Sequence, residues 1–221
     1  MSRPDIPKLL RRHASLLLIV LGAFLLVYVT AEYSQMFWNQ RRLEREWAAQ
    51  QRRLDKGPSQ PTTSAAFKDD GLTRLSIPKI DFAAVIVEGT GRRELLLGPG
   101  HITNTPAPGE PGNSVISAHR DTFFRHIYEL NKGDEILVQR NGKSYRYEVT
   151  SKRIVEPTDL SVLEPTHDSR LTLITCYPTY YVGPAPERLV VTSTLVKDAG
   201  TQADANASPA VERTSQTRVV H

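Results

Sequence analysis

The chain has a single cysteine, Cys176, and its surroundings favour a nucleophile. It follows an apolar, β-branched run at residues 171–175, and the chain turns directly after it at Tyr177-Pro178. A thiolate attacks carbonyl carbon, and a reactive group that follows a strand into a loop has a rigid support. A buried structural cysteine, the commoner role for a lone cysteine, would more often lie inside the apolar run. We therefore predict that Cys176 does chemistry.

One cysteine also excludes several classes of protein. An internal disulfide, a CxxC redox pair and a zinc site with several cysteines are all ruled out. The formal net charge is +4, but the basic residues are scattered, or interleaved with acidic ones as in residues 41–55. That pattern is typical of a solvated helix face, so we do not expect nucleic-acid binding.

A histidine close to the thiol would serve as its proton partner, and the chain has six. Three are set aside because of their positions: His13 precedes an apolar run, His167 lies in a charged loop and His221 ends the chain. His119 ends the apolar run at 115–118, in the same strand-exit position as Cys176. Two groups at the exits of neighbouring strands can meet, so His119 is favoured, with His101 and His126 as the remaining candidates.

Acyl transfer also needs a donor for the developing oxyanion. Arg188 begins the last predicted strand, after a loop that separates it from Cys176. A strand, a loop and a returning strand would bring this guanidinium back beside the thiol. An arginine at a strand start is usually a surface charge, so the prediction for Arg188 depends on its combination with the cysteine and the histidine.

The elements that must position these residues are short strands. The turn signal Asn141-Gly142 predicts a hairpin, residues 89–97 could form a short helix, and the proline- and glycine-rich residues 98–112 are expected to be loop. Many short strands separated by turns predict an all-β barrel or sandwich. The predicted strands are residues 72–77, 82–87, 114–118, 135–139, 144–150, 171–175 and 189–195.

An apolar segment near the N-terminus predicts a membrane anchor. Residues 14–31 carry no charge and are just long enough to cross a bilayer core, at about 1.5 Å per residue. Arg11 and Arg12 precede the run directly, which favours a cytoplasmic N-terminus and an extracytoplasmic remainder. The alternative is a signal peptide cleaved after Val29-Thr30-Ala31; the length of the run favours the uncleaved anchor.

These patterns divide the chain into five parts. We predict a cytoplasmic N-terminus, a transmembrane anchor, a helical stalk with a flexible linker, a catalytic domain and a disordered polar tail. Their boundaries are residues 1–13, 14–31, 32–70, 71–197 and 198–221.

Across residues 72–195 the sequence resembles the sortase family. Thr172-Leu173-Ile174-Thr175-Cys176 matches the TLxTC signature, and Arg188 matches the arginine at the start of the next strand. The details are most similar to class D sortases. The other segments that resemble recurring sortase motifs are Ser117-Ala118-His119-Arg120-Asp121, Ile77-Pro78-Lys79-Ile80 and Gly98-Pro99-Gly100-His101.

The resemblance implies an eight-stranded barrel with Cys176, His119 and Arg188 at one rim. It implies a membrane-anchored cysteine transpeptidase that cleaves an LPxTG-like sorting signal after its threonine through a thioacyl-enzyme. The protein would then be transferred to an amine on the cell wall or on a pilin subunit. Thr175 is expected to contact the substrate. We expect no cofactor and no metal.

Some alternatives remain open at this stage. For Arg120 and Asp121, a supporting role in the site and a plain surface pair are equally compatible with the sequence. A papain-like hydrolase is disfavoured, because there the cysteine precedes the histidine. A non-catalytic, membrane-tethered binding domain could keep the barrel without the chemistry, and thiol labelling with loss of activity would distinguish it.

Overall fold

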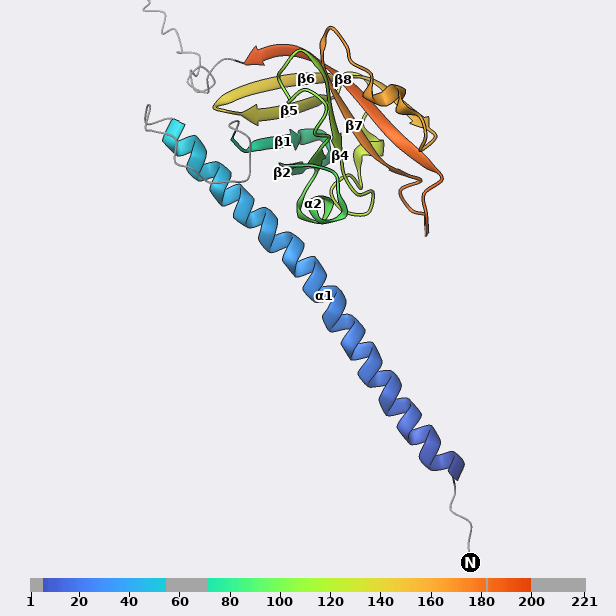
Figure 1. Cartoon of the computed structure of the whole chain (residues 1–221). Helices are drawn as coiled ribbons and strands as arrows, with labels where there is room; N and C mark the ends of the chain where they lie inside the picture. The colour runs from blue at the N-terminus through green and yellow to red at the C-terminus, as the bar shows by residue number, and fades with distance from the viewer. Residues whose placement is uncertain (1–5, 55–70, 182, 200–221) are drawn as a thin grey trace, which may run out of the picture.

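The computed structural model of the protein describes residues 6–54, 71–181 and 183–199. The predicted linker lies almost entirely outside these residues, and so does most of the predicted tail. A long N-terminal helix, α1, leads to a domain of strands and short helices (Figure 1). The short helix expected in residues 89–97 is present as α2, Arg92–Leu97.

The strands form a closed barrel in the order β1-β2-β3-β4-β7-β8-β6-β5, so the prediction of an eight-stranded barrel is confirmed. Two neighbouring pairs are parallel, β2 with β3 and β4 with β7, and the other pairs are antiparallel. Three short 3-10 helices, η1 (Pro78–Ile80), η2 (Ile127–Glu129) and η3 (Leu160–Leu163), lie between strands. The strands are β1 Thr73–Ile77, β2 Phe82–Glu88, β3 Gly100–His101, β4 Gly112–Ser117, β5 Glu135–Arg140, β6 Lys143–Val155, β7 Ser169–Tyr177 and β8 Glu187–Ala199.

The hairpin between β5 and β6 follows its sequence signal. Asn141 and Gly142 have φ of 52° and 74°, the left-handed conformation that a two-residue hairpin turn requires. The last strand is longer than expected: β8 continues to Ala199 because its end pairs with Ser144 at the start of β6. Strand β6 also extends beyond residue 150, and that part pairs with the beginning of β8, up to Val155 with Arg188.

The two-residue strand β3 lies in a segment predicted to be loop. It forms because Gly100 lets two backbones approach: a Cβ at this position would overlap the carbonyl oxygen of Gly89. Its shortness leaves most of β2 without a strand partner on that side, since only Val87 and Glu88 pair with β3.

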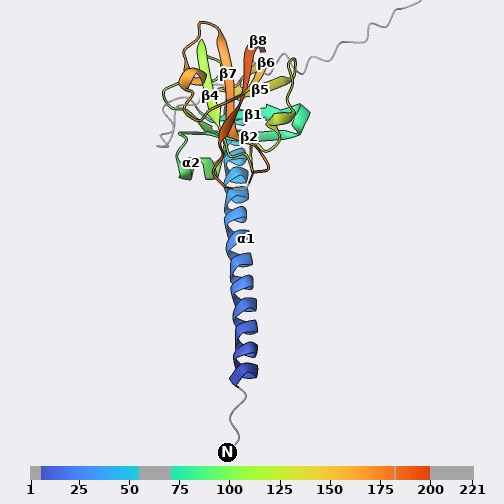
Figure 2. The same ribbon diagram turned by 90° about the vertical axis from the view of Figure 1, so that its right-hand side faces the viewer.

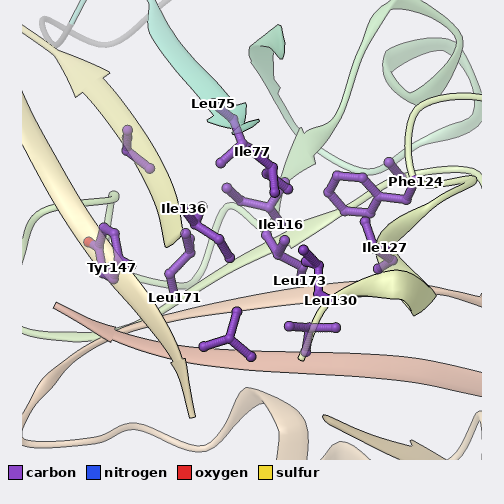
Figure 3. Packing of buried hydrophobic residues seen from close by; sticks show 14 of the residues in the cluster. Leu75, Ile77, Ile116, Phe124, Ile127, Leu130, Ile136, Tyr147, Leu171 and Leu173 are labelled. Carbon is purple, nitrogen blue, oxygen red and sulfur yellow. The ribbon is translucent and has the colours of Figure 1, made fainter. Parts of the chain in front are cut away.

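Side chains alternate along each strand, so the inner and outer faces of the barrel wall contribute to two different apolar clusters. The interior cluster fills the barrel, and its fully buried members include Leu75, Ile116, Phe124 and Leu173 (Figure 3). Burying each such side chain contributes roughly 1.5–3 kcal/mol relative to its exposure. A smaller outer cluster packs η3 against the outside of β4, β7 and β8; its buried members are Val115, Val162, Ile174 and Val190.

Helix α1, Ile6–Leu54, is continuous over 49 residues and roughly 74 Å long. The apolar run thus continues without a break into the segment that the sequence analysis assigned to a stalk. The apolar part extends away from the barrel, and every side chain from His13 to Ala31 is exposed (Figures 1 and 2). Among the described residues, α1 alone is long and apolar enough to cross a membrane.

The second half of α1 packs against the barrel and covers the open edge of β2. The side-chain amide of Gln40 donates to the carbonyl oxygen of Val85 at 3.2 Å and accepts from the Val85 N–H at 3.2 Å. It also donates to the carbonyl oxygen of Leu97 at 2.6 Å. Farther along α1, Glu44 forms an ion pair with Arg74 at 3.1 Å. The stalk is therefore docked on the barrel rather than free.

Candidate active site

Cys176 and Arg188 are direct partners in the antiparallel ladder of β7 and β8. The sequence predicted that Cys176 follows its strand, and this is wrong: β7 continues to Tyr177. The backbone at position 176 still pairs with that at 188, so the strand ends one residue beyond the cysteine. The thiol is therefore carried by a paired strand and not by the loop.

Both side chains lie on the outer face of the sheet. Side chains alternate along a strand, so Cys176 shares the face of Ile174, which belongs to the outer cluster. By the same alternation, Arg188 shares the face of Val190 in that cluster. Cross-strand partners on one face have Cβ atoms about 4.5–5.5 Å apart, so the guanidinium can reach a group bound at the half-buried thiol.

His119 reaches the same place from the other side of β7. In the parallel pairing of β4 with β7, Ser117 is the partner of Ile174. The ladder continues past the end of β4, because the Ala118 N–H donates to the carbonyl oxygen of Ile174 at 3.2 Å. His119 is the next residue after Ala118, so its backbone lies beside the end of β7 that carries Cys176. The backbones of the three residues predicted to be catalytic therefore lie at one rim of the barrel.

Within the described residues, neither the His119 ring nor the Cys176 thiol makes a hydrogen bond, so both are available to a substrate. The guanidinium of Arg188 donates through Nη1 to two backbone carbonyls that precede it in the chain, Glu187 at 2.9 Å and Ala185 at 3.4 Å. These bonds hold the guanidinium against the backbone at the start of β8. Catalytic hydrogen bonds often tighten only when substrate is bound.

Thr175 lies on the opposite face from Cys176. Its side chain is 2% exposed, and its hydroxyl donates to the carbonyl oxygen of Ala118 at 2.7 Å. This bond ties β7 to the residue before His119. The geometry therefore favours a positioning role for Thr175, and the substrate contact implied by the resemblance stays a prediction.

The two other histidine candidates do not accompany the thiol. His101 is buried on β3, where Nδ1 lies 2.9 Å from Oε2 of Glu88 and Nε2–H donates to the carbonyl oxygen of Pro106 at 3.0 Å. Its ladder partner is Ile116, an interior residue, so its ring is on the opposite face from Cys176. His126 is exposed and pairs with Glu129 at 2.8 Å.

A buried polar residue that the sequence analysis missed holds the outer cluster in place. The side-chain amide of Asn113 donates to the carbonyl oxygens of Val162 at 2.9 Å and Glu164 at 3.2 Å, next to η3. Its Oδ1 accepts from the Thr172 hydroxyl at 2.7 Å. A polar residue near the start of each of two otherwise apolar strands is the signal that could have revealed it. These bonds fix the segment that packs over β4 and β7 beside the candidate site.

Two cavities of the barrel do not include the cysteine in their lining. One, of about 590 Å³, adjoins the β7–β8 loop and is lined by Tyr128, Tyr177 and Tyr180 among others. The other, of about 450 Å³, surrounds His101. No group of three or more histidine, cysteine or acidic side chains that could bind a metal occurs in the part of the chain that the structure describes.

Comparison with known proteins agrees with this fold and site. The sequence model of the Sortase domain family matches residues 75–196, more than half of the chain. Sortase D of Bacillus subtilis is 42% identical over 118 residues, which are 53% of this chain and 60% of that protein. Sortase A of Listeria monocytogenes is 32% identical over 113 residues, 49% of this chain and 50% of that protein.

Solved structures give the same result. A Clostridium perfringens Sortase D5 transpeptidase superposes with a TM-score of 0.57 at 25% identity, covering 74% of this chain and 99% of that one. Sortase C-1 from Actinomyces oris gives a TM-score of 0.55 at 28% identity, covering 71% of this chain and 99% of that one.

The chain therefore belongs to the sortase family. The match to Sortase D agrees with the class D resemblance seen in the sequence. The chain spans between half and about 60% of the length of these curated relatives. Its cysteine lies on a strand, which excludes the papain-like arrangement with a helical cysteine-bearing segment.

Proposed function

We propose that the protein is a membrane-anchored cysteine transpeptidase with Cys176, His119 and Arg188 as its catalytic residues. The observation that carries the proposal is the pairing of Cys176 with Arg188 between β7 and β8, with His119 two residues beyond the end of β4, the other neighbour of β7. A nucleophile, a proton carrier and a cationic donor within reach of one another are the groups that acyl transfer needs.

In the first half-reaction the thiolate of Cys176 attacks the carbonyl carbon of the threonine in an LPxTG-like signal. The charge that develops on the carbonyl oxygen is stabilised by the guanidinium of Arg188. The bond between the threonine carbonyl carbon and the next nitrogen then breaks, and His119 donates a proton to the leaving amine. The product is a thioacyl-enzyme on Cys176.

In the second half-reaction an amine on the cell wall or on a pilin subunit attacks the thioacyl carbon. His119 accepts the proton that the amine loses, and the carbon–sulfur bond breaks to release Cys176. The net result is transfer of a surface protein that bears a C-terminal sorting motif to the amine. Thr175 keeps the two strands at the correct separation through its bond to Ala118.

The anchor proposal is that residues 14–31 stay in the membrane with the catalytic domain, residues 71–197, on the extracytoplasmic side. Helix α1 lies against the barrel within its first turns after this segment. There Tyr33 and Met36 line a cavity together with Phe82 and His126. Docking of α1 would then hold the site close to the membrane surface. Sequencing the mature N-terminus tests this: a start at Glu32 would show a cleaved signal peptide.

The direct test of activity is incubation of the full-length protein in detergent with a library of pentapeptide motifs and a small amine. Mass spectrometry should find an LPxTG-like peptide cut after threonine and joined to the amine, and Cys176→Ala should abolish both products. If the wild-type protein binds such peptides without cutting any of them, the protein is the non-catalytic binding domain instead.

A further inference from the structure

Arg120, the residue after His119, extends from the loop that follows β4 to the loop that joins β7 to β8. Its Nη1 donates to the carbonyl oxygen of Pro178 at 3.1 Å, and its Nη2 donates to that of Gly183 at 2.7 Å. The guanidinium also lies 5.8 Å from the centre of the Tyr181 ring, within the range of a cation–π contact. One side chain thus makes three contacts with a single loop.

This arrangement decides between the two roles that the sequence left open for Arg120. Within the described residues, Arg120 forms no ion pair with Asp121, so the two are not a surface pair. A guanidinium offers several donors in a rigid plane, which lets one side chain bond two carbonyls in fixed directions. Lysine has a single nitrogen at the end of a flexible chain and could not hold both carbonyls in the same way.

The loop held by Arg120 is the one that connects Cys176 to Arg188. Pro178 lies two residues after the cysteine, and Gly183 lies two residues before Ala185. The carbonyl oxygens of Ala185 and Glu187 in turn accept from the guanidinium of Arg188. The contacts therefore run from Arg120 to the loop and from the loop to Arg188.

We propose that Arg120 is a positioning residue for the acyl-transfer step: it fixes the β7–β8 loop so that the guanidinium of Arg188 is in place before substrate binds. The inference rests on the proposed function for the role of Arg188. The contacts of Arg120 are with the loop and not with the side chains of Cys176 or Arg188. It acts through the loop carbonyls, and it also links the loop of His119 to the segment between the other two catalytic residues.

The test compares Arg120→Ala and Arg120→Lys with Arg125→Ala, all in the full-length protein. Arg125 is an exposed arginine five residues away whose side chain makes no hydrogen bond or ion pair among the described residues, so it is the matched control. In single-turnover acylation by a sorting peptide, Arg120→Ala should be slower than wild type by about tenfold to a hundredfold, as expected for a displaced catalytic group. The acylation rate of Arg120→Lys should lie between those of wild type and Arg120→Ala, and that of Arg125→Ala should match wild type.

Two further measurements separate positioning from loss of structure. The rate at which iodoacetamide alkylates Cys176 should change far less in Arg120→Ala than the acylation rate does, because alkylation forms no oxyanion for Arg188 to stabilise. Hydrogen exchange should become faster in Arg120→Ala at the amides of residues 179–181 and 183–187, while the barrel strands keep their protection. Arg125→Ala should match wild type in both measurements.

The inference would be overturned if Arg120→Ala were acylated at the wild-type rate. It would also be overturned if hydrogen exchange in the β7–β8 loop were the same in this variant as in wild type. An equal loss of acylation and alkylation would also overturn it, because Arg120 would then act on the thiol or on His119. If none of the sorting peptides acylates the wild-type protein, the proposed function fails. The loop exchange, which needs no activity, still decides whether Arg120 fixes the loop.

Discussion

The backbone of Cys176 pairs with that of Arg188 across two adjacent strands, so the fold of the barrel sets their separation. Both side chains lie on the outer face, at the end of β7 and the start of β8. A guanidinium held in this way acts as a preorganised donor, and its contribution depends on geometry as well as on charge.

The first prediction concerns that geometry. Arg188→Lys keeps the charge but removes the planar arrangement of donors. The acylation rate should fall by about 10²–10³, the usual effect of losing one oxyanion donor. The measurement is single-turnover acylation with a peptide that wild-type protein cleaves. Arg92→Lys, at an exposed position of α2, is the matched control and should react at the wild-type rate. Equal rates for the two variants would show that Arg188 contributes charge alone.

The second prediction separates the three histidines. His119→Ala should lose turnover, because no other group would carry the proton to the leaving amine. His126→Ala should resemble wild type, because His126 is exposed. His101→Ala should lower the thermal unfolding midpoint, since it leaves Glu88 and the carbonyl of Pro106 without their partner. The turnover of its folded fraction should stay close to wild type.

The measurement is turnover per folded molecule, with circular dichroism as the check on folding. If His119→Ala turns over normally while one of the other two variants is inactive with its fold intact, the assignment of the proton carrier is wrong.

The third prediction concerns the edge of β2. Gln40→Leu leaves the N–H and carbonyl of the buried Val85 without partners, which should cost about 1–3 kcal/mol. A loss of this size lowers the unfolding midpoint by roughly 2–4 °C for each kcal/mol. Gln35→Leu, at an exposed position of α1, is the control and should unfold like wild type.

Because α1 covers the open edge of β2, a fragment of residues 33–199 should be more stable than one of residues 71–199. Equal midpoints for the two fragments would mean that α1 does not stabilise the barrel.

The sequence predicted the elements whose signals are local. The run at 171–175 and the turn at Asn141-Gly142 each carry a pattern within a few residues, and both elements are present. The register between strands is not a local property. The similar positions of His119 and Cys176 at the ends of their apolar runs were nevertheless enough to predict that the two residues lie close together.

What the sequence could not show depends on long-range contacts. A two-residue strand such as β3 has no periodicity to detect. The partner of Gln40 is Val85, 45 residues away, so a helix predicted from composition gave no sign of docking. The role of Arg120 depends on where the β7–β8 loop folds back, and the buried hydroxyl of Thr175 depends on which face of β7 points inward.

The fourth prediction concerns acid stability. Burial opposes the charged form of Asp134, but the N–H of Asn131 at 2.6 Å and the ammonium of Lys79 at 2.9 Å outweigh it and lower the pKa. A lowered pKa means that the carboxylate stabilises the fold above its unfolded pKa of about 3.9, and that this stabilisation is lost as pH falls through the folded value. Asp134→Asn should therefore be less stable than wild type at neutral pH, and the difference should close below about pH 4.

Thermal unfolding of both proteins across this pH range measures the effect. Lys79→Gln should reproduce part of it, because it removes one of the two partners of the carboxylate. A difference between wild type and Asp134→Asn that stays constant with pH would contradict the assignment of the ion pair.

The central claim is that Cys176 forms a thioacyl bond with a sorting peptide. Full-length protein should be mixed with an LPxTG-like peptide, quenched in acid and weighed intact by mass spectrometry. We expect a mass increase equal to the peptide up to its threonine, less one water, and its removal by an added amine. Tandem mass spectrometry should place the adduct on Cys176, and Cys176→Ala should carry none. Cleavage that continues in Cys176→Ala, or an adduct on another residue, would contradict the account.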